Sequence, residues 1–489
     1  MRVTCDLSDI KKMSCDLLCV LLTKEDTAPA DLDKLLKGQI AELRRRKHFQ
    51  GEALERGTFV PHPPQRFARV LLVGLGRPSE VTLDRIRRAG GTAGQAAMGR
   101  VVTLWPKQLP VALDTGRAAQ AFVEGFILGG YRDLRFRSES AGRQDVQQLT
   151  LLTPQERQVA KLRAGAGRGR ILAELQNLCR DLSGAPGNVL TPTALAGEAR
   201  KLARKHGLRI SVYDRRLIER MKMGAFLAVA KGSAEPPKLI RLDYTPKGRA
   251  RKRVILVGKG ITFDTGGISI KPGENMFEMR QDMTGAAVVI CAMAALAQLR
   301  PALAVTALIP TCENMPGSRA YKPGDVVTTS IGKTIEIINT DAEGRLLLAD
   351  VLGHATKSRP DYLIDVATLT GAATVALGNA GAAILATSDI LVEKFAAASA
   401  TTGEKIWRLP LWEEYEQQIK SNIADMVNSG GRPAGTITAA LLLKKFTGGI
   451  PWLHLDIAAV DYEYRGTEIT PKGPSGFGMR TVVEALTNL

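Results

Sequence analysis

The sequence is poor in cysteine, and the few cysteines are badly placed for covalent or metal cross-links. Only six occur in 489 residues, and only Cys15 and Cys19 lie close together. A disulfide framework needs several pairs, and a structural zinc site of thiolates needs a second close pair. We therefore expect reduced cysteines with structural roles, in a chain long enough to build sizeable hydrophobic cores.

Long hydrophobic runs are also missing. The longest, Gly285–Leu299, falls short of the roughly 18 residues that a membrane-spanning helix needs, and it is typical of a buried helix. The first apolar run of the chain is bracketed by Asp6, Asp9 and Asp16, whereas a secretory signal peptide begins with basic residues. These features predict a cytoplasmic protein with no membrane partner.

Positive charge is in excess and unevenly spread. The net charge is +18, and residues 1–170 carry 29 Lys and Arg against 18 Asp and Glu. The run from Arg44 to Lys47 is typical of a solvated helix face, and nucleic-acid binding by the basic N-terminal third is the alternative. Aromatic residues make up only 5% of the sequence, and few lie among these arginines, so stacking on bases has little support.

Apolar runs typical of strands alternate with helical patterns along the whole chain. This alternation predicts an α/β fold with mainly parallel strands. A stretch of Ala, Gly and Arg at 163–170 reads as a connector, and we place a domain boundary near 150–175. Beyond it, Thr284–Leu299 and Glu343–Lys357 are expected as helices, and Ala225–Ala230 is expected as one of several strands.

Three polar clusters adjoin predicted elements in the second half of the chain. One lies in a glycine-rich loop after a hydrophobic strand, one opens the helix Thr284–Leu299, and one follows the predicted strand Thr334–Ile338. Open α/β sheets present their ligand sites at such strand ends. Taken alone, Thr340 with Glu343 fits a capping box of the following helix. The charged residues of the three clusters are Lys259, Asp264, Lys271, Asp282, Asp341, Glu343 and Arg345.

The acidic side chains of these clusters predict a metal site. Four carboxylates in one pocket would repel one another, and two divalent cations would balance their charge. Oxygen ligands suit hard or borderline divalent metals, and a lysine can join them once its amine is deprotonated. Lys271 and Arg345 are not needed for this balance, so they are free to bind substrate or transition-state oxygens. Phosphatases, nucleases and aminopeptidases all use two-metal sites, and the chemistry alone leaves these three open.

Histidine contributes little to this site. None of the five histidines lies inside the three clusters, so neither a histidine-based zinc site nor a Ser-His-Asp triad has support. His354 falls in the helix after the third cluster, and His454 falls in a predicted strand. Both are expected to pack or to form hydrogen bonds.

The stretch Asn339–Leu346, which reads NTDAEGRL, resembles the signature of the leucyl aminopeptidase family of cytosolic two-metal aminopeptidases. Residues 259–272 and 282–287 resemble the metal and catalytic segments of that family, and the similarity extends from about residue 180 to the C-terminus. The resemblance implies release of N-terminal amino acids from peptides, preferably leucine and other apolar residues, by a homohexamer. It also implies an N-terminal α/β domain over 1–155, a connecting helix or linker over 156–178, and a larger catalytic α/β domain with a central mixed, mainly parallel sheet over 179–489.

The resemblance further implies a role for each acidic residue and for one lysine. Asp264 and Glu343 would bridge two divalent ions, zinc or manganese. Lys259 and Asp282 would complete one metal site, and Asp341 would complete the other.

By the same resemblance, the two remaining cations act on the substrate. Lys271 would polarise the scissile carbonyl and stabilise the oxyanion, and Arg345 would hold a bicarbonate-like anion that acts as general base. Pro474 and Ser475 depart from the residues usual in the family, which leaves the side-chain preference open. The first side-chain pocket would be lined by Met279, Thr368 and Gly371.

Overall fold

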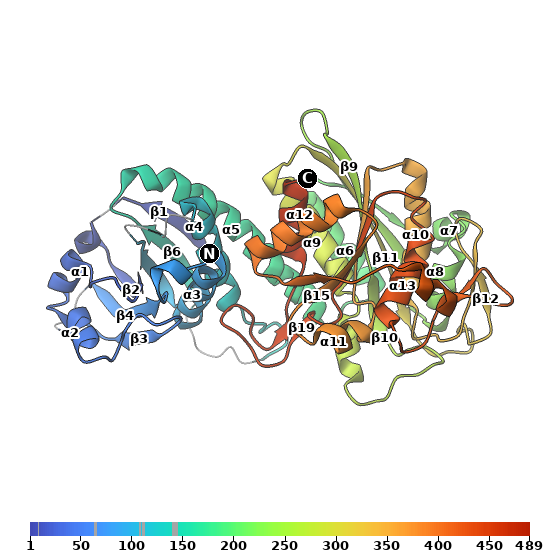
Figure 1. Ribbon diagram of the computed structural model, residues 1–489, viewed down its shortest axis with the longest axis horizontal. Coiled ribbons are helices and arrows are strands. Elements are labelled where there is room, and N and C mark those ends of the chain that lie inside the picture. Colours follow the sequence, from blue (N-terminus) through green and yellow to red (C-terminus); the bar gives the residue numbers. More distant parts are fainter. Residues whose placement is uncertain (8, 63–65, 107–108, 110–112, 139–144) are drawn as a thin grey trace. The chain divides into compact units, whose positions relative to one another are not determined.

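The computed structural model describes residues 1–7, 9–62, 66–106, 109, 113–138 and 145–489, and these divide into two compact units (Figure 1). The helix α5, Glu156–Gly184, runs from the first unit into the second. The segment Tyr464–Lys472 groups with the first unit, although its place in the sequence favours the larger one. Unit 1 comprises Met1–Asn177 and Tyr464–Lys472, and unit 2 comprises Leu178–Glu463 and Gly473–Leu489.

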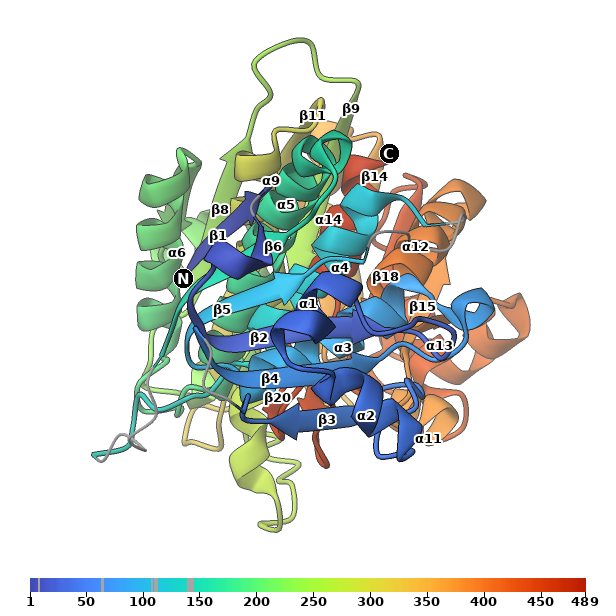
Figure 2. The ribbon, with the colours of Figure 1, turned by 90° about the vertical axis from the view of Figure 1, so that its left-hand side faces the viewer.

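Unit 1 is a layered α/β unit. Its strands and helices before α5 are β1 (Arg2–Asp6), β2 (Cys15–Leu22), α1 (Ala30–Leu35), α2 (Gln39–Arg45), β3 (Arg56–Phe59), β4 (Phe67–Gly74), α3 (Leu83–Ala96), β5 (Gly99–Leu104), α4 (Thr115–Gly129) and β6 (Val146–Leu152). The six strands form one sheet in the order β1-β6-β5-β2-β4-β3, visible as successive arrows in Figure 2. Only the β3–β4 pair is antiparallel among the described pairs. Alternate residues of β2 face opposite sides, so Leu17 packs in the core formed with α3 and α4, and Leu18 in the core formed with α1 and α2.

Unit 2 is larger and also of α/β type. Its strands are β7 (Arg209–Tyr213), β8 (Lys238–Tyr244), β9 (Lys252–Gly258), β10 (Gly260–Asp264), β11 (Leu303–Asn314), β12 (Val326–Thr328), β13 (Thr334–Glu336), β14 (Tyr362–Ala367), β15 (Ala382–Ala386), β16 (Ile406–Arg408), β17 (Met426–Val427), β18 (Trp452–Asp456), β19 (Tyr462–Glu463) and β20 (Gly473–Pro474). Its α-helices after α5 are α6 (Pro192–His206), α7 (Arg215–Arg220), α8 (Gly224–Val229), α9 (Thr284–Leu299), α10 (Gly344–Ala355), α11 (Gly371–Leu377), α12 (Asp389–Thr402), α13 (Gly435–Lys444) and α14 (Met479–Thr487).

The central sheet of unit 2 has nine strands, in the order β16-β15-β18-β14-β9-β11-β8-β7 with β10 beside β11. The strands β18, β14, β9, β11 and β10 pair in parallel, so their carboxyl ends meet at one edge. The pairs β15–β18, β8–β11 and β7–β8 are antiparallel. This arrangement confirms the predicted two-part α/β fold with a mixed, mainly parallel central sheet.

Helix α9 is a long apolar helix of the core. The short 3₁₀ helix Met276–Gln281 precedes it, and the two together are long and apolar enough to cross a membrane. However, 83% of the most apolar 18-residue stretch of this segment is buried inside the protein. Its residues from Thr284 to Leu296 are all buried. The run Gly285–Leu299 is therefore a core helix, as its length predicts.

One strand prediction was wrong. Residues 225–230 do not extend the sheet but form helix α8 and the start of a 3₁₀ turn. A short apolar run fits either a strand or a buried helix, and Ala and Leu favour the helix. The carboxylate of Asp350 accepts a hydrogen bond from the N–H of Phe226 at 2.8 Å, which satisfies one free donor at the helix start.

Candidate metal centre

The carboxyl ends of the parallel strands bring the first site residues together. Lys259 directly follows β9, and Thr368 directly follows β14. The glycine-rich segment after β9 was predicted as a loop, but it continues as β10, so Asp264 stands at a strand end. Asp264 lies in register with Asn314, the last residue of β11. All four residues therefore lie at one edge of the sheet.

Two helix starts supply the remaining acids. Asp282 lies just before α9, and Glu343 occupies the N-cap position of α10. The predicted capping box does not form, because the hydroxyl of Thr340 donates instead to the carbonyl oxygen of Gly266 at 2.6 Å and accepts from the N–H of Ser269 at 2.8 Å. Thr340 thereby ties the loop before α10 to the glycine-rich segment.

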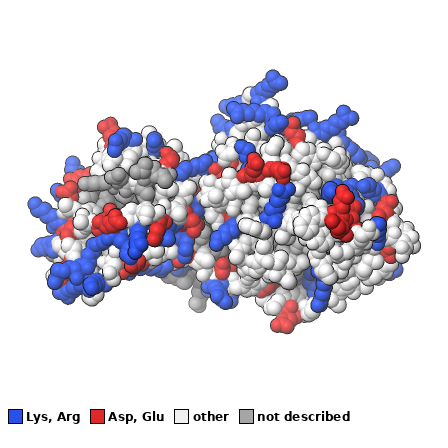
Figure 3. Space-filling model, in the orientation of Figure 1, with Lys and Arg blue, Asp and Glu red and all other residues white. Residues whose placement is uncertain are grey.

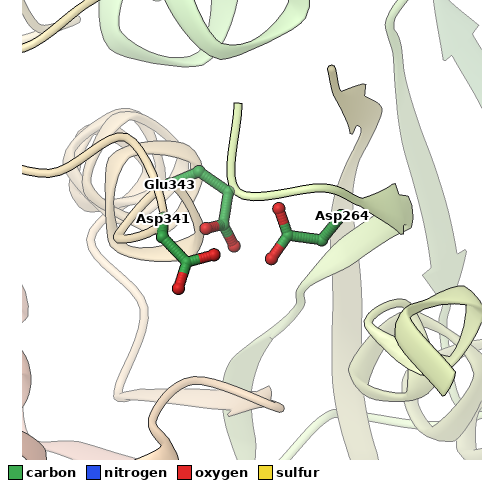
Figure 4. Close-up of side chains that lie close together, drawn as sticks. All are labelled: Asp264, Asp341 and Glu343. Carbon is green, nitrogen blue, oxygen red and sulfur yellow. The ribbon is translucent and has the colours of Figure 1, made fainter. Parts of the chain in front are cut away.

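The acidic side chains converge on one point. Oxygens from the carboxylates of Asp264, Asp341 and Glu343 all lie within 4.8 Å of one another, and Figure 4 shows the three groups turned toward each other. Lys259 Nζ lies 2.7 Å from Asp282 Oδ1 and 2.8 Å from Glu343 Oε1. Asp282 therefore joins the same cluster through Lys259.

Lys271 reaches the cluster from its more open side. Its Nζ lies 2.9 Å from Asp264 Oδ2 and 2.5 Å from Asp341 Oδ1. The side chains of Lys271 and Asp341 are 22% and 32% exposed, whereas that of Lys259 is 3% exposed. The cluster is therefore more open to solvent beside Lys271 and Asp341 than beside Lys259.

Burial and charge oppose each other throughout this cluster. Burial raises the pKa of Asp264 to about 6 and raises the pKa of Asp282 well above its usual value. Burial disfavours the charged form of Glu343 as well, but Lys259 and Lys271 outweigh it and lower the pKa of this carboxyl. Burial likewise works against the charge of Lys259, yet its acidic neighbours raise the pKa of this amine. The charges of Glu343 and Lys259 are thus sustained by opposite charges nearby, whereas burial works against the charges of Asp264 and Asp282.

These residues fit divalent metal ions. Oxygen donors dominate the set, which suits hard or borderline divalent cations. In the described part of the chain, the buried oxygens Asp282 Oδ2 and Glu343 Oε2 have no hydrogen-bond partner. A buried carboxylate oxygen without a partner is costly, and a cation bound between these groups would satisfy both.

Arg345 lies in the first turn of α10 with its guanidinium buried. Its Nη1 donates to the carbonyl oxygen of Asn428 at 2.8 Å, and its Nε has no partner among the described residues. Burial lowers the pKa of Arg345 to about 10, although the negative charges of Glu343 and Asp456 act to raise it. The side chain is therefore a cation at neutral pH. A buried cation with a free donor suits a small oxyanion.

The expected pocket residues take different positions. Thr368 contacts the cluster directly, because its hydroxyl donates to Asp282 Oδ1 at 2.8 Å and its carbonyl oxygen accepts from Lys259 Nζ at 2.8 Å. Met279 is half-buried and lies three residues before Asp282. Gly371 is exposed and is the first residue of α11.

The unusual pair Pro474 and Ser475 lies in unit 2. Pro474 ends β20, and the hydroxyl of Ser475 donates to the carbonyl oxygen of Val460 at 2.6 Å. The N–H of Ser475 donates to the carbonyl oxygen of Asp461. These contacts fix the backbone of the segment to residues 460–461.

Sequence reasoning missed two residues that support the acids. Asn314 is fully buried, and its Nδ2 donates to Asp264 Oδ1 at 2.7 Å and to the carbonyl oxygen of Thr340 at 3.0 Å. The hydroxyl of Tyr321 donates to the same carbonyl oxygen at 2.7 Å. The position of Asn314 at the end of a parallel strand was a usable signal, whereas Tyr321 lies in a loop without a pattern.

The basic run of unit 1 is a surface feature. Arg45 donates two hydrogen bonds to Glu42, and Arg46 also pairs with Glu42. Arg44 donates to the carbonyl oxygen of Lys24 at 2.7 Å. Figure 3 shows Lys and Arg over the region of α1 and α2 and around the loop between β8 and β9, with acidic residues among them. The run therefore has the character of a solvated, partly paired helix face.

The whole chain is similar to one family of known proteins. Residues 177–483 match the model of the catalytic domain of the cytosol aminopeptidase family, and residues 20–140 match the model of the N-terminal domain of that family. A probable cytosol aminopeptidase of Syntrophotalea carbinolica is 42% identical over 483 residues, which cover 97% of each chain. A probable cytosol aminopeptidase of Roseiflexus castenholzii is 42% identical over 491 residues, which cover 99% of each chain.

Solved structures agree as well. The bottromycin maturation enzyme BotP in complex with Mn is 35% identical with a TM-score of 0.87, over 97% of this chain and 99% of that one. A mutant of tomato leucine aminopeptidase is 33% identical with a TM-score of 0.89, over 100% of this chain and 97% of that one. The chain belongs to the cytosol aminopeptidase family and is a metallo-aminopeptidase.

Proposed function

We propose that this protein releases N-terminal leucine and other apolar residues from peptides, using two divalent metal ions, zinc or manganese. The observation that carries this proposal is the meeting of acids from separate segments, with oxygens of Asp264, Asp341 and Glu343 within 4.8 Å of one another. The manganese in the BotP structure supports a divalent metal.

The ion pairs of the cluster suggest how its ligands divide. Lys259 and Asp282 lie beside Glu343, and they would hold one ion. Asp341 lies with Asp264 around Lys271, and it would hold the other. Asp264 and Glu343 would serve both ions. When bound, the two ions would activate a water molecule and stabilise the negative charge that develops on the substrate.

Two cations of the chain would act on the substrate itself. Lys271 stands on the open side of the cluster, where its ammonium group can polarise the scissile carbonyl and stabilise the oxyanion. Arg345 would hold a bicarbonate-like anion that accepts the proton of the attacking water, and its unpartnered Nε supports this role. Met279, Thr368 and Gly371 would line the pocket for the first side chain of the peptide.

We further propose a cytoplasmic homohexamer. The names of the relatives place those proteins in the cytosol. Unit 2 exposes several large apolar side chains, which subunit contacts commonly bury. They are Val375, Trp407, Trp412 and Ile423.

Nucleic-acid binding by the N-terminal third has less support. Arg45 and Arg46 are both engaged by Glu42, which lowers the charge that they offer to phosphates. The aminopeptidase proposal explains the buried charges of the metal cluster, and nucleic-acid binding does not.

Hydrolysis of leucine p-nitroanilide, with and without a chelator, tests the proposed function. We expect hydrolysis by the protein as purified, loss of turnover after chelation, and recovery when Zn²⁺ or Mn²⁺ is added back. N-acetylleucine p-nitroanilide is the control substrate and should resist cleavage, because its amine is blocked. Turnover of nitrophenyl phosphate in place of the leucine substrate, or hydrolysis that no chelator affects, would overturn the proposal.

A further inference from the structure

A row of buried polar side chains lies beneath the loop between β14 and α11. His454 pairs with Asp365 across the parallel strands β14 and β18, and its Nδ1 lies 2.5 Å from Asp365 Oδ1. On the other side of the ring, Nε2 lies 4.0 Å from Asp456 Oδ2. All three side chains are fully buried. Two acids thus flank one imidazole inside the core of unit 2.

The second of these acids holds the loop. Asp456 Oδ1 accepts a hydrogen bond from the N–H of Leu369 at 3.1 Å, and Oδ2 accepts one from the hydroxyl of Thr370 at 2.7 Å. The same hydroxyl caps α11 by accepting from the N–H of Ala373 at 3.3 Å. Asp456 therefore fixes the loop and the first turn of α11 together.

The other end of this short loop contacts the metal cluster. Thr368 directly precedes Leu369, and it accepts from Lys259 Nζ and donates to Asp282 Oδ1. A change in the position of Leu369 would therefore move a wall of the cluster. Consecutive residues of the loop therefore bond to the two sides: Thr368 to the proposed ligands, and Leu369 and Thr370 to Asp456.

Charge explains why the row contains a histidine. A buried carboxylate needs a counter-charge, because its desolvation is costly. Burial disfavours the charged form of His454, but Asp365, with a contribution from Asp456, raises the pKa of the ring above its usual value. Arg345 is a second cation whose charge interacts with Asp456. His454 and Arg345 thus both interact electrostatically with Asp456.

We propose that Asp456, supported by His454 and Asp365, is a positioning residue that holds the loop 368–371 in the shape that receives the first side chain of the peptide. This inference rests on the proposed aminopeptidase function. Among the described residues, Asp456 forms no hydrogen bond or ion pair with the acidic cluster, so it acts through Leu369 and Thr370. Its loss should therefore change KM more than kcat.

The variant Thr370→Val tests the link with little change of shape. We expect KM for leucine p-nitroanilide to rise about tenfold, the dissociation constant of free leucine to rise in parallel, and kcat to stay within about threefold. Thr191→Val is the matched control. The hydroxyl of Thr191 caps α6 in the way that Thr370 caps α11, because it accepts a hydrogen bond from the N–H of Ala194 at 3.3 Å. The control should lower stability and leave KM unchanged.

Two substitutions of the acid itself extend the test. Asp456→Ala removes both acceptors, whereas Asp456→Asn keeps one oxygen for the N–H of Leu369. We expect KM to increase from the parent protein to Asp456→Asn and again to Asp456→Ala, with unchanged metal content. Adding Thr370→Val to Asp456→Ala should raise KM by less than Thr370→Val does alone, because the two changes share one broken hydrogen bond. Thr370→Val also removes the bonds of this hydroxyl to Ala373 and Thr436, so a smaller effect remains.

The outcomes separate this inference from the proposed function. A Thr370→Val protein that behaves like Thr191→Val, with lower stability and KM within about twofold of the parent, overturns the inference even if Asp456→Ala does not fold. Additive effects of Thr370→Val and Asp456→Ala overturn it as well. A parent protein that neither hydrolyses leucine p-nitroanilide nor binds leucine overturns the proposed function, and this inference with it.

Discussion

Lys271 and Lys259 each pair with two acids, but they differ in exposure, and this difference separates their proposed roles. Lys259 is buried and close to Glu343, as a ligand must be, whereas Lys271 borders the open side. We expect the Lys271→Met protein to keep its metal ions, and we expect its kcat to fall about 10²- to 10³-fold, because an oxyanion donor is removed. Metal analysis and leucine p-nitroanilide kinetics measure both effects.

Lys201→Met is the matched control for this change. Lys201 lies on α6, is largely exposed and pairs with Glu198 at 2.7 Å. Its loss should leave turnover unchanged, since exposed pairs contribute little. A Lys271→Met protein with near-normal turnover would remove Lys271 from the mechanism, and one without metal would show that it stabilises the ligands instead.

At the scale of elements, the close packing of α9 on β14 sets the position of Asp282. A Cβ atom at Gly285 would lie 2.2 Å from the carbonyl oxygen of Val366, so Gly285→Ala must push the helix away from the strand. We expect a loss of about 1–3 kcal/mol in the free energy of unfolding, together with a lower metal content. Urea denaturation and metal analysis are the measurements.

A second helical glycine provides the control. Gly197 lies in α6, and apart from the adjoining backbone of this helix no heavy atom lies within 4 Å of an added Cβ, so Gly197→Ala should raise stability by about 0.5–1 kcal/mol through helix propensity alone. If both variants gain stability, the packing of α9 on β14 does not constrain the helix as described.

Elements can be predicted from the sequence where the residues that determine them lie close together along the chain. The bounds of α9 follow from an apolar run that Pro301 stops, and Asp264 and Glu343 stand out because charged clusters recur beside the strands and helix starts of one predicted sheet. The helix α8 was missed because its start is satisfied by Asp350, which lies far away in the sequence. The role of Thr340 was missed for the same reason, since its hydroxyl bonds Gly266 rather than its own helix. Long-range hydrogen bonds leave no periodic pattern.

At the scale of the whole molecule, the proposed hexamer predicts a particle mass. Light scattering after gel filtration should give six times the chain mass of 52.7 kDa. The exposed Trp407, with 68% of its surface accessible, should then lose access to a soluble quencher relative to a dissociated sample. A mass equal to one chain at micromolar concentration would contradict the hexamer.

The segment Tyr464–Lys472 completes unit 1 although it lies near the end of the sequence. Arg88 Nε pairs with Glu468 Oε2 at 2.9 Å, and the side-chain amide of Gln95 donates to the carbonyl oxygen of Thr467 at 3.0 Å. The chain therefore passes between the units three times. During synthesis on the ribosome, the N-terminal unit cannot finish folding until almost the entire polypeptide has emerged, and a protease that cuts the first crossing, between residues 177 and 178, separates residues 1–177 covalently from the segment that completes their unit.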